Sequence, residues 1–192
     1  MPGSSEDSTE VNPLECRGYV LYNRVVIPDF SCARKIYWNG YYGSFLGVSK
    51  PRDESITAPL ELSLIEALYL VEEKRLKVLY EGSILNAEDV RRLGVERVPR
   101  FIELYAVYRD LREKKLIPRR GLKFGCDYLV YRRGPGVDHA PFGVQVYRAE
   151  EHVDPIELVR MGRLLHSVRK NLVIAIYTGS SVLYHMLEWW KP

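Results

Sequence analysis

The run Gly121-Leu-Lys-Phe-Gly-Cys-Asp-Tyr-Leu-Val-Tyr-Arg-Arg-Gly-Pro-Gly-Val-Asp-His139 joins a short apolar segment to a glycine-rich turn. The apolar part, residues 128–131, predicts a buried strand, and the glycines and proline at 134–136 predict the turn that follows. The strand therefore ends on the phenol of Tyr131. The loop then returns with the imidazole of His139.

Two features further along the chain extend this arrangement. A second strand with an alternating pattern is expected over residues 142–147, and Lys170 lies where a later helix gives way to a third strand. Tyr131, His139 and Lys170 can move a proton or hold a phosphate without a metal, so we take them as the candidate catalytic set. Each of the three alone is more often structural or merely solvated. The prediction therefore depends on their ordered combination.

The overall composition is that of a soluble globular chain. It has 192 residues, 46% hydrophobic and 28% charged, which is enough for one large domain or two small ones. No apolar run approaches the roughly 18 residues that span a bilayer, so we expect no membrane association. Residues 1–13 are polar and acidic, which predicts a disordered tail rather than a signal or transit peptide, and hence a cytoplasmic protein.

The cysteines do not form a recognisable pattern. Cys16, Cys32 and Cys126 are far apart, odd in number and without metal-like spacing, so we interpret them as reduced cytosolic thiols. We expect neither a metal nor a cofactor.

Basic residues surround every part of the candidate site. The net charge of +3 only weakly favours a polyanionic partner. The distribution is more informative, because the cations cluster before and after the first strand and on and after a later helix: Arg119, Arg120, Lys123, Arg132, Arg133, Arg160, Arg163, Arg169 and Lys170. A phosphate backbone would favour this distribution, whereas the alternative is a solvated charged surface around a core.

Residues 14 to about 58 are expected to be β-rich, with strands over 19–22 and 24–27. Residues 37–52 mix aromatics and glycines with the cations Lys50 and Arg52. This segment predicts either a hairpin that packs its tyrosines on the sheet or an RNA-contacting loop that offers stacking faces and charge.

Capping signals predict where helices begin. Ser63 and Glu66 are spaced as a capping box, and Asn86 with Asp89 begins a shorter helix that we expect Gly94 to end. Residues 95–99 are the expected domain boundary, with Pro99 in the first turn of the next helix. Apolar residues recur in that helix at a spacing that predicts core packing: Phe101, Leu104, Tyr105, Tyr108 and Leu111.

The remaining elements complete an α/β fold. Asp154 and Pro155 begin a helix that should run to about residue 168, and strands are expected over 170–177 and 182–189. We therefore predict an N-terminal mixed α/β domain over 14–96. A C-terminal domain over 97–192 should hold a central mixed sheet flanked by helices.

Four motifs together resemble one known family. Residues 108–112, 121–128, 131–139 and 166–170 are similar to the archaeal tRNA-splicing endonucleases, also called tRNA-intron endonucleases, and most closely to the catalytic subunit of the two-subunit type. The resemblance implies a C-terminal nuclease domain. It also implies removal of introns from precursor tRNA at a bulge-helix-bulge without a metal, leaving 2′,3′-cyclic phosphate and 5′-hydroxyl ends.

The resemblance also implies residue roles. Tyr131 matches the family's base, His139 its general acid, and Lys170 its stabiliser of the charged transition state. Arg163 matches an arginine that stacks on a bulge base in the opposite active site, and Trp189 matches a second stacking position, with Trp190 as the competing choice.

The chemistry of the three side chains agrees with these roles. Histidine titrates near neutrality and suits proton donation, and a lysine supplies a fixed cation where negative charge develops. Tyrosine is the difficult member, because a reference pKa of about 10 leaves only on the order of 10⁻³ ionised at pH 7. Tyr131 therefore needs nearby cations or acts mainly by orientation.

One departure from the family pattern concerns assembly. Members that assemble with themselves carry acidic residues in the loop matching 178–181, whereas this loop has none. The resemblance then implies a second, structural subunit and an α₂β₂ heterotetramer. Two alternatives stay open: a metal-dependent nuclease that uses Asp127 with Lys123 or Lys170 beside magnesium, and a non-catalytic RNA-binding or structural subunit of the same complex.

Overall fold

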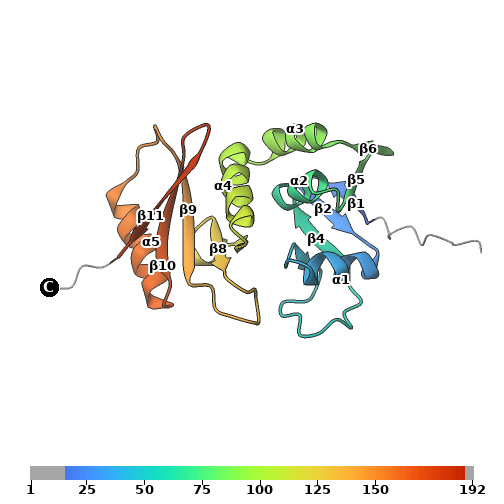
Figure 1. The fold of residues 1–192 in the computed structure, drawn as a ribbon, viewed down its shortest axis with the longest axis horizontal. Helices are drawn as coiled ribbons and strands as arrows, with labels where there is room; N and C mark the ends of the chain where they lie inside the picture. The colour runs from blue at the N-terminus through green and yellow to red at the C-terminus, as the bar shows by residue number, and fades with distance from the viewer. Residues whose placement is uncertain (1–15, 189–192) are drawn as a thin grey trace, which may run out of the picture.

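Two β-sheets, one from each half of the chain, form the frame of the molecule (Figure 1). The computed structural model describes residues 16–188. The first half contains a six-stranded sheet in the order β3-β4-β2-β1-β5-β6, and the second a five-stranded sheet in the order β11-β10-β9-β8-β7. Helices pack on both sheets, so the predicted mixed α/β fold is confirmed.

The first sheet is mostly antiparallel, with one parallel pairing between β1 and β5. Its strands are β1 (Arg17–Leu21), β2 (Arg24–Ile27), β3 (Ser44–Phe45), β4 (Leu60–Ser63), β5 (Lys77–Tyr80) and β6 (Ser83–Leu85). The helices of this half are α1 (Phe30–Trp38), α2 (Leu64–Glu72) and α3 (Ala87–Arg97).

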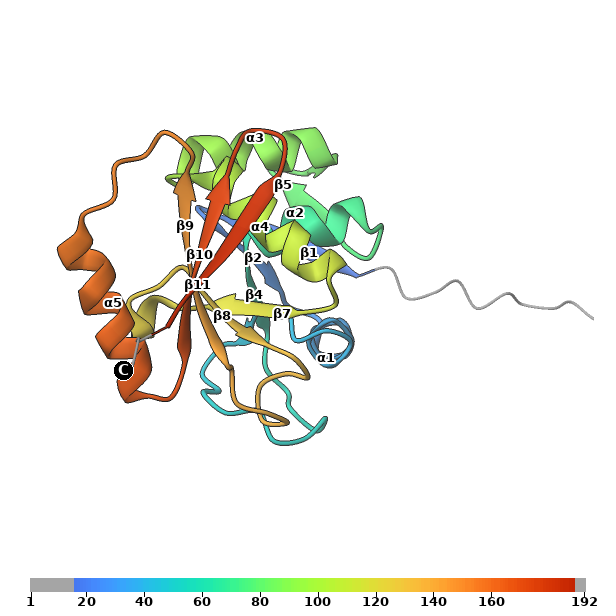
Figure 2. The ribbon, with the colours of Figure 1, turned by 60° about the vertical axis from the view of Figure 1, so that its left-hand side comes forward.

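The second half alternates helix and strand around the other sheet. Its elements are α4 (Phe101–Glu113), β7 (Ile117–Arg120), a 3₁₀ turn at Leu122–Phe124, β8 (Tyr128–Tyr131), β9 (Phe142–Arg148), α5 (Pro155–Ser167), β10 (Asn171–Tyr177) and β11 (Val182–Leu187). Strands β9 and β10 pair in parallel across the α5 crossover, and the other pairings are antiparallel. The sheet lies between α5 on one side and α4 on the other (Figure 2).

Both predicted capping boxes are confirmed. The Ser63 hydroxyl accepts from the Glu66 N–H while the Glu66 carboxylate accepts from the Ser63 N–H, and Asn86 and Asp89 exchange the same pair of bonds. Such reciprocal bonds satisfy donors that a helix start leaves unpaired, which is why the sequence signal located these helices well. The Asp154 cap and Pro155 at the first position of α5 are confirmed too.

The strands predicted over 19–22 and 24–27 are confirmed as β1 and β2. Two other expectations for the first half are wrong. The region expected to be β-rich also holds α1, which Asp29 caps and which buries Cys32, Ala33, Ile36 and Tyr37 on one face. Residues 37–52 are not a hairpin, because β3 pairs with β4 and an irregular loop over 46–59 connects them. The buried residues of α1 do recur at a helical spacing. The aromatic residues and glycines that follow them obscured this pattern.

Two predictions about helix ends near the junction of the two halves are also wrong. Gly94 does not end α3, which continues to Arg97; a Cβ at residue 94 would lie 2.3 Å from the Phe101 ring, so this glycine admits a close aromatic contact. Pro99 precedes α4 instead of occupying its first turn, and Arg100 takes a left-handed conformation before Phe101. The boundary between domains over 95–99 stays a prediction, because one hydrophobic core runs across both halves.

The cysteine interpretation is wrong for two of the three residues. Cys16 and Cys32 form a disulfide with a Cα–Cα distance of 5.4 Å, and Cys126 is free and buried. The β1–β2 hairpin turns the chain back so that the first turn of α1 meets the residue preceding β1. This proximity is a tertiary consequence that a separation of 16 residues does not reveal.

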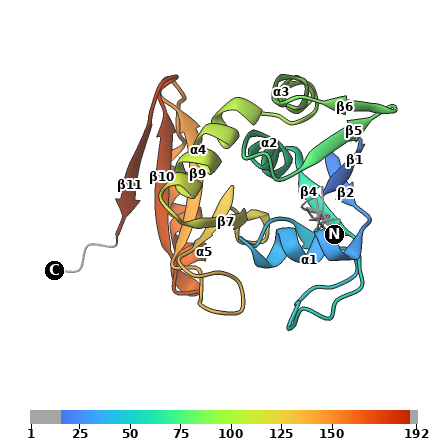
Figure 3. The same ribbon diagram turned by 45° about the vertical axis from the view of Figure 1, so that its right-hand side comes forward.

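The chain ends predicted from sequence lie partly beyond the described residues. The tail over 1–13 and the side chains of Trp189 and Trp190 fall outside them, and β11 ends at Leu187. Strand β11 forms the edge of its sheet (Figure 3). Over the described part of the chain, no helix combines the length and the apolar character needed to cross a membrane.

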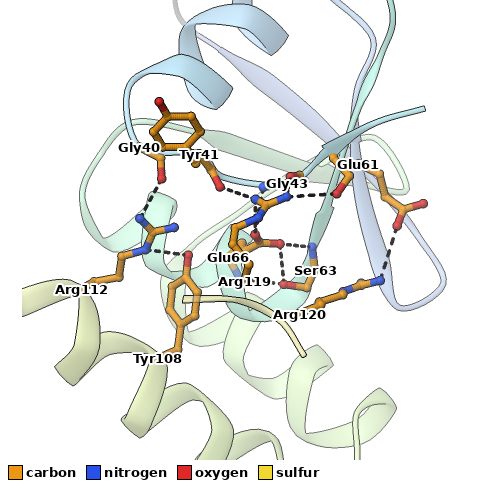
Figure 4. A network of polar contacts seen from close by, with 11 residues as sticks. Gly40, Tyr41, Gly43, Glu61, Ser63, Glu66, Tyr108, Arg112, Arg119 and Arg120 are labelled. Carbon is orange, nitrogen blue, oxygen red and sulfur yellow. Dashed lines mark hydrogen bonds and ion pairs between the residues drawn. The ribbon is translucent and has the colours of Figure 1, made fainter. Parts of the chain in front are cut away.

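A buried polar network joins the two halves (Figure 4). The Glu66 carboxylate accepts from the N–H of Gly43 at 2.9 Å and from the N–H and hydroxyl of Ser63 at 2.9 and 2.8 Å. Arg119 of β7 lies 3.8 Å from the same carboxylate, and its guanidinium donates to the backbone oxygens of Tyr41 and Gly43. A charged pair therefore ties the second sheet to the first turn of α2, and the bonds to the backbone oxygens tie it to the segment that leads into β3.

A second arginine reinforces this contact from α4. Arg112 is buried, donates to the Gly40 carbonyl at 2.8 Å and to the Tyr108 hydroxyl at 3.0 Å, and lies 4.0 Å from the centre of the Tyr42 ring. Two guanidinium groups of the second half thus hold the carbonyls of Gly40, Tyr41 and Gly43. This segment is therefore fixed against the second half of the chain.

The acid dependence of stability should follow from Glu66. Burial raises the pKa of this carboxyl, but Arg119 and the donors on Ser63 and Gly43 outweigh burial and hold the pKa below its usual value. Because the folded pKa is the lower one, ionised Glu66 stabilises the fold above the unfolded pKa of about 4.3, and this contribution is lost as the pH falls through the folded pKa.

We predict that Glu66→Gln lowers the free energy of unfolding at pH 7 by about 3 kcal/mol, because Arg119 loses its counterion in a buried site. The variant should also lose less stability than the wild type on acidification. Urea unfolding at pH 7 and at pH 3, well below the unfolded pKa, measures both effects. Glu113→Gln, which breaks an exposed ion pair with Arg109, is the control and should change stability by less than about 0.5 kcal/mol. Equal effects of the two substitutions would contradict the prediction.

Candidate active site

A cavity of about 830 Å³ lies between the two halves and contains the predicted catalytic set. Tyr131, His139 and Lys170 line it from the second half, and Lys50 and Arg52 line it from the loop after β3. This loop and the loop after β8 lie at the same end of the molecule (Figures 1 and 3). The structure therefore brings together five of the seven site residues predicted from sequence.

Strand register explains why three distant residues meet. Val130 of β8 lies opposite Phe142 of β9, so Tyr131 ends its strand where β9 begins. Asn171 of β10 is also opposite Phe142, because β9 and β10 run parallel. Lys170 precedes β10 and therefore lies at the same sheet end, next to the loop that carries His139.

Lys170 makes a direct link to that loop. Its ammonium group donates to the Ala140 carbonyl at 2.9 Å and lies 5.6 Å from the centre of the Phe124 ring. The side chain is half-buried, and Ala140 follows His139 directly in the chain. The cation is thus held beside the candidate general acid while it still lines the open cavity.

Tyr131 is half-buried, and its surroundings disfavour ionisation. Burial raises the pKa of its hydroxyl, the Arg119 guanidinium lowers it in part, and the Asp138 carboxylate raises it further, with a net increase above the usual value. Arg119 is therefore the nearby cation that the sequence argument required. It was recognised only as one of several flanking cations, because its place in the same cavity wall as Tyr131 depends on the β7–β8 pairing, in which Arg119 lies opposite Leu129 and Ile117 opposite Tyr131.

His139 is exposed at the cavity, and within residues 16–188 its imidazole makes no hydrogen bond. Its location is therefore set by the backbone that carries it. The neighbouring Asp138 accepts hydrogen bonds from the N–H groups of Arg132, Arg133 and Gly134 and so organises the whole loop. Asp138 was not among the site residues predicted from sequence, although an aspartate in a glycine-rich turn is a usual signal for such bonds.

The predicted RNA-contacting residues occupy different surroundings. Lys50 and Arg52 are exposed at the cavity, whereas Arg163 is exposed on α5 and does not line it. Trp189, like Trp190, lies outside the described residues.

The carboxylate of the metal-dependent alternative is engaged elsewhere. Asp127 pairs with Arg100 at 3.2 Å, accepts from the Val146 N–H at 2.8 Å, and does not line the cavity. Among the described residues, no group of three or more His, Cys, Asp and Glu side chains is placed to hold a metal ion. The residues that this alternative requires are therefore not assembled around Asp127.

Comparison with known proteins gives matches over nearly the whole chain. Residues 101–184 match the family model for the tRNA intron endonuclease catalytic C-terminal domain, and residues 16–91 match that for the tRNA intron endonuclease N-terminal domain. The chain is 47% identical over 180 residues to a tRNA-splicing endonuclease of Hyperthermus butylicus, a match that covers 92% of this chain and 99% of the relative. It is 42% identical over 178 residues to a tRNA-splicing endonuclease of Sulfolobus acidocaldarius, covering 91% and 98%.

The raised pKa of Tyr131 can be measured directly. We predict that its hydroxyl titrates above pH 10, because burial and Asp138 together exceed the effect of Arg119. Carbon-13 NMR of Cζ-labelled tyrosine gives the titration curve, and the signal absent from Tyr131→Phe identifies the residue. Free tyrosine in the same buffer is the control. A midpoint at or below that of free tyrosine would contradict the prediction.

Proposed function

The chain belongs to the tRNA intron endonuclease family, and on that premise we propose that it cuts introns from precursor tRNA at a bulge-helix-bulge without a metal. The products would carry 2′,3′-cyclic phosphate and 5′-hydroxyl ends. The observation that carries the proposal is the convergence of Tyr131, His139 and Lys170 in one cavity that also has basic residues at its rim. We place this activity in the cytoplasm, because the enzyme must reach newly made tRNA.

The three side chains match the proton and charge requirements of cleavage by a neighbouring 2′-hydroxyl. The 2′-oxygen bonds to phosphorus as its proton passes to the Tyr131 phenolate. The bond from phosphorus to the 5′-oxygen breaks as that oxygen takes a proton from protonated His139. Lys170 offsets the negative charge that develops on the phosphate oxygens. Atoms and charge balance without any further reactant.

The raised pKa of Tyr131 disfavours the phenolate that this scheme requires. With its pKa raised, less than about 10⁻³ of the hydroxyl is ionised at pH 7. Arg119 limits the shift, and the fixed position of the phenol also orients the 2′-hydroxyl for in-line attack. Orientation of the reacting groups accounts for a large part of the catalysis in such a site.

Assembly completes the proposal. The turn at 178–181 is closed by bonds between Thr178 and Ser181 and carries no carboxylate. We infer a second, structural subunit that supplies the acidic loop, and an α₂β₂ heterotetramer with two active chains. In this assembly Arg163 and Trp189 would stack on bulge bases at the opposite active site, which suits the location of Arg163 away from its own cavity.

The decisive experiment is cleavage of a bulge-helix-bulge precursor tRNA in excess chelator, by this chain alone and with its structural subunit. We expect cleavage with cyclic phosphate ends only in the mixture, and a loss of at least about 10²-fold in His139→Ala. Full activity of the chain alone would overturn the heterotetramer. Cleavage only after magnesium is restored would overturn the metal-free mechanism, and no cleavage in either case would favour the non-catalytic subunit.

The loop after β3 gives an independent prediction about RNA binding. Replacing Lys50 and Arg52 together by alanine should weaken binding of precursor tRNA and reduce the slope of log K against log salt by about 1 to 2, because each cation neutralises one phosphate. Filter binding at several salt concentrations measures both. Lys35→Ala, an exposed cation on α1 that does not line the cavity, is the matched control. The same salt slope in the double variant and the wild type would contradict an RNA contact.

A further inference from the structure

The loop that carries His139 depends on contacts that hold its backbone. The imidazole makes no hydrogen bond within the described residues, as noted above, so any displacement of residues 132–138 moves the candidate acid directly. Lys170 holds the far end of this loop through the Ala140 carbonyl. Two further contacts hold the part of the loop over residues 132–138.

The first contact is with a single carboxylate inside the loop. Asp138 accepts from the N–H groups of Arg132 at 3.2 Å, Arg133 at 3.1 Å and Gly134 at 2.9 Å. The N–H of Asp138 in turn donates to the Gly134 carbonyl at 3.1 Å. Three consecutive amides therefore converge on the residue that precedes His139, and charge-assisted bonds of this kind are the stronger ones in proteins.

The second contact comes from the other half of the chain. The Tyr41 ring lies directly against Gly134, since a Cβ at residue 134 would be 2.2 Å from a ring carbon of Tyr41. Gly134 is buried and has a φ of 129°, so glycine is required both for the turn and for this contact. The loop is thus held from within by the Asp138 carboxylate and contacted from the first half by the Tyr41 ring.

Tyr41 is itself rigidly placed. Its N–H donates to the Tyr37 carbonyl at 2.5 Å, its carbonyl accepts from Arg119, and its ring meets the rings of Tyr37 and Trp38 edge-on at 5.6 and 6.1 Å between centres. The support behind the loop therefore extends through Arg119 into the buried network of Figure 4.

We propose that Tyr41 and Asp138 are positioning residues that together fix the His139 loop in its reactive geometry. The first half of the chain thereby acts on the rate of cleavage as well as on RNA binding. This inference rests on the proposed endonuclease function. A displacement of about 1 Å can reduce an enzymatic rate by about 10²-fold, which sets the size of the expected effects.

The test combines a rate with a readout that does not need activity. In Tyr41→Ala and Asp138→Ala, the single-turnover rate at saturating precursor tRNA should fall by about 10- to 100-fold, while the dissociation constant for the RNA changes less than about threefold. Hydrogen exchange of the amides at 132–134 should become faster in both variants. Thermal unfolding checks that each variant is folded.

Conservative substitutions distinguish a positioning role of these side chains from a general loss of folded structure. Tyr41→Phe keeps the ring and should restore the rate, and Asp138→Asn keeps one acceptor oxygen and should give an intermediate rate. Tyr19→Ala and Glu150→Ala are the matched controls, because both side chains are exposed and away from the cavity. They should leave the rate and the exchange unchanged.

The outcomes distinguish this inference from the function on which it rests. Faster exchange at 132–134 with an unchanged cleavage rate, or a loss confined to RNA affinity, would overturn the positioning roles. Unchanged hydrogen exchange at 132–134 in Tyr41→Ala and Asp138→Ala would also overturn the positioning roles. This result would count even if the wild-type protein showed no cleavage activity. A wild-type complex that holds the loop but does not cut precursor tRNA would overturn the proposed function instead.

Discussion

The ion pair between Arg119 and Glu66 is the contact on which the arrangement of the two halves depends. Its carboxylate belongs to the first turn of α2 and its guanidinium to β7, an edge strand of the other sheet. A buried charge must have a partner, so neither half can move away from the other without exposing or abandoning one of the two. The same guanidinium also holds the carbonyls of Tyr41 and Gly43, which fixes the segment that supports the His139 loop.

This constraint has a direct consequence for chemistry, because Arg119 also lines the cavity that contains Tyr131. A single side chain thus joins the halves, supports the cavity wall and lowers the pKa of the phenol in part. The cavity is consequently a feature of both halves together. An RNA substrate that enters it would meet catalytic groups from one half and the exposed cations Lys50 and Arg52 from the other. This division suits a large polyanionic substrate, for which phosphate contacts position the chain and a few groups act on one bond.

Much of the fold could be predicted because its signals are local. The capping boxes at Ser63 and Asn86, the Asp154 cap and the strands that flank the His139 loop each depend on neighbouring residues alone. The convergence of Tyr131, His139 and Lys170 followed from a resemblance in motif order. The physical reason appears only in the register of β8, β9 and β10.

The errors arose where tertiary contacts decide. Gly94 has the appearance of a helix stop but admits the Phe101 ring, and the Cys16–Cys32 bond depends on how a hairpin returns the chain. Strand β7 was missed because Pro118 weakens its pattern, although an edge strand tolerates a proline. The role of Arg119 likewise required the folded geometry, since neither motif nor spacing specifies which groups its side chain approaches. Asp138 had a local turn signal, but the three amides that it binds are seen only in the structure.

A crystal structure of the two-subunit complex with precursor tRNA carrying a 2′-deoxy nucleotide at the cleavage site would show whether Tyr131, His139 and Lys170 surround the scissile phosphate. The missing hydroxyl prevents the reaction, so the intact substrate should remain in place. We expect the scissile phosphate in the cavity, with its 5′-oxygen within hydrogen-bond distance of His139, a non-bridging oxygen near Lys170, and the 2′-carbon facing Tyr131. A phosphate bound outside this cavity, or held there by a divalent cation, would exclude catalysis by these three side chains.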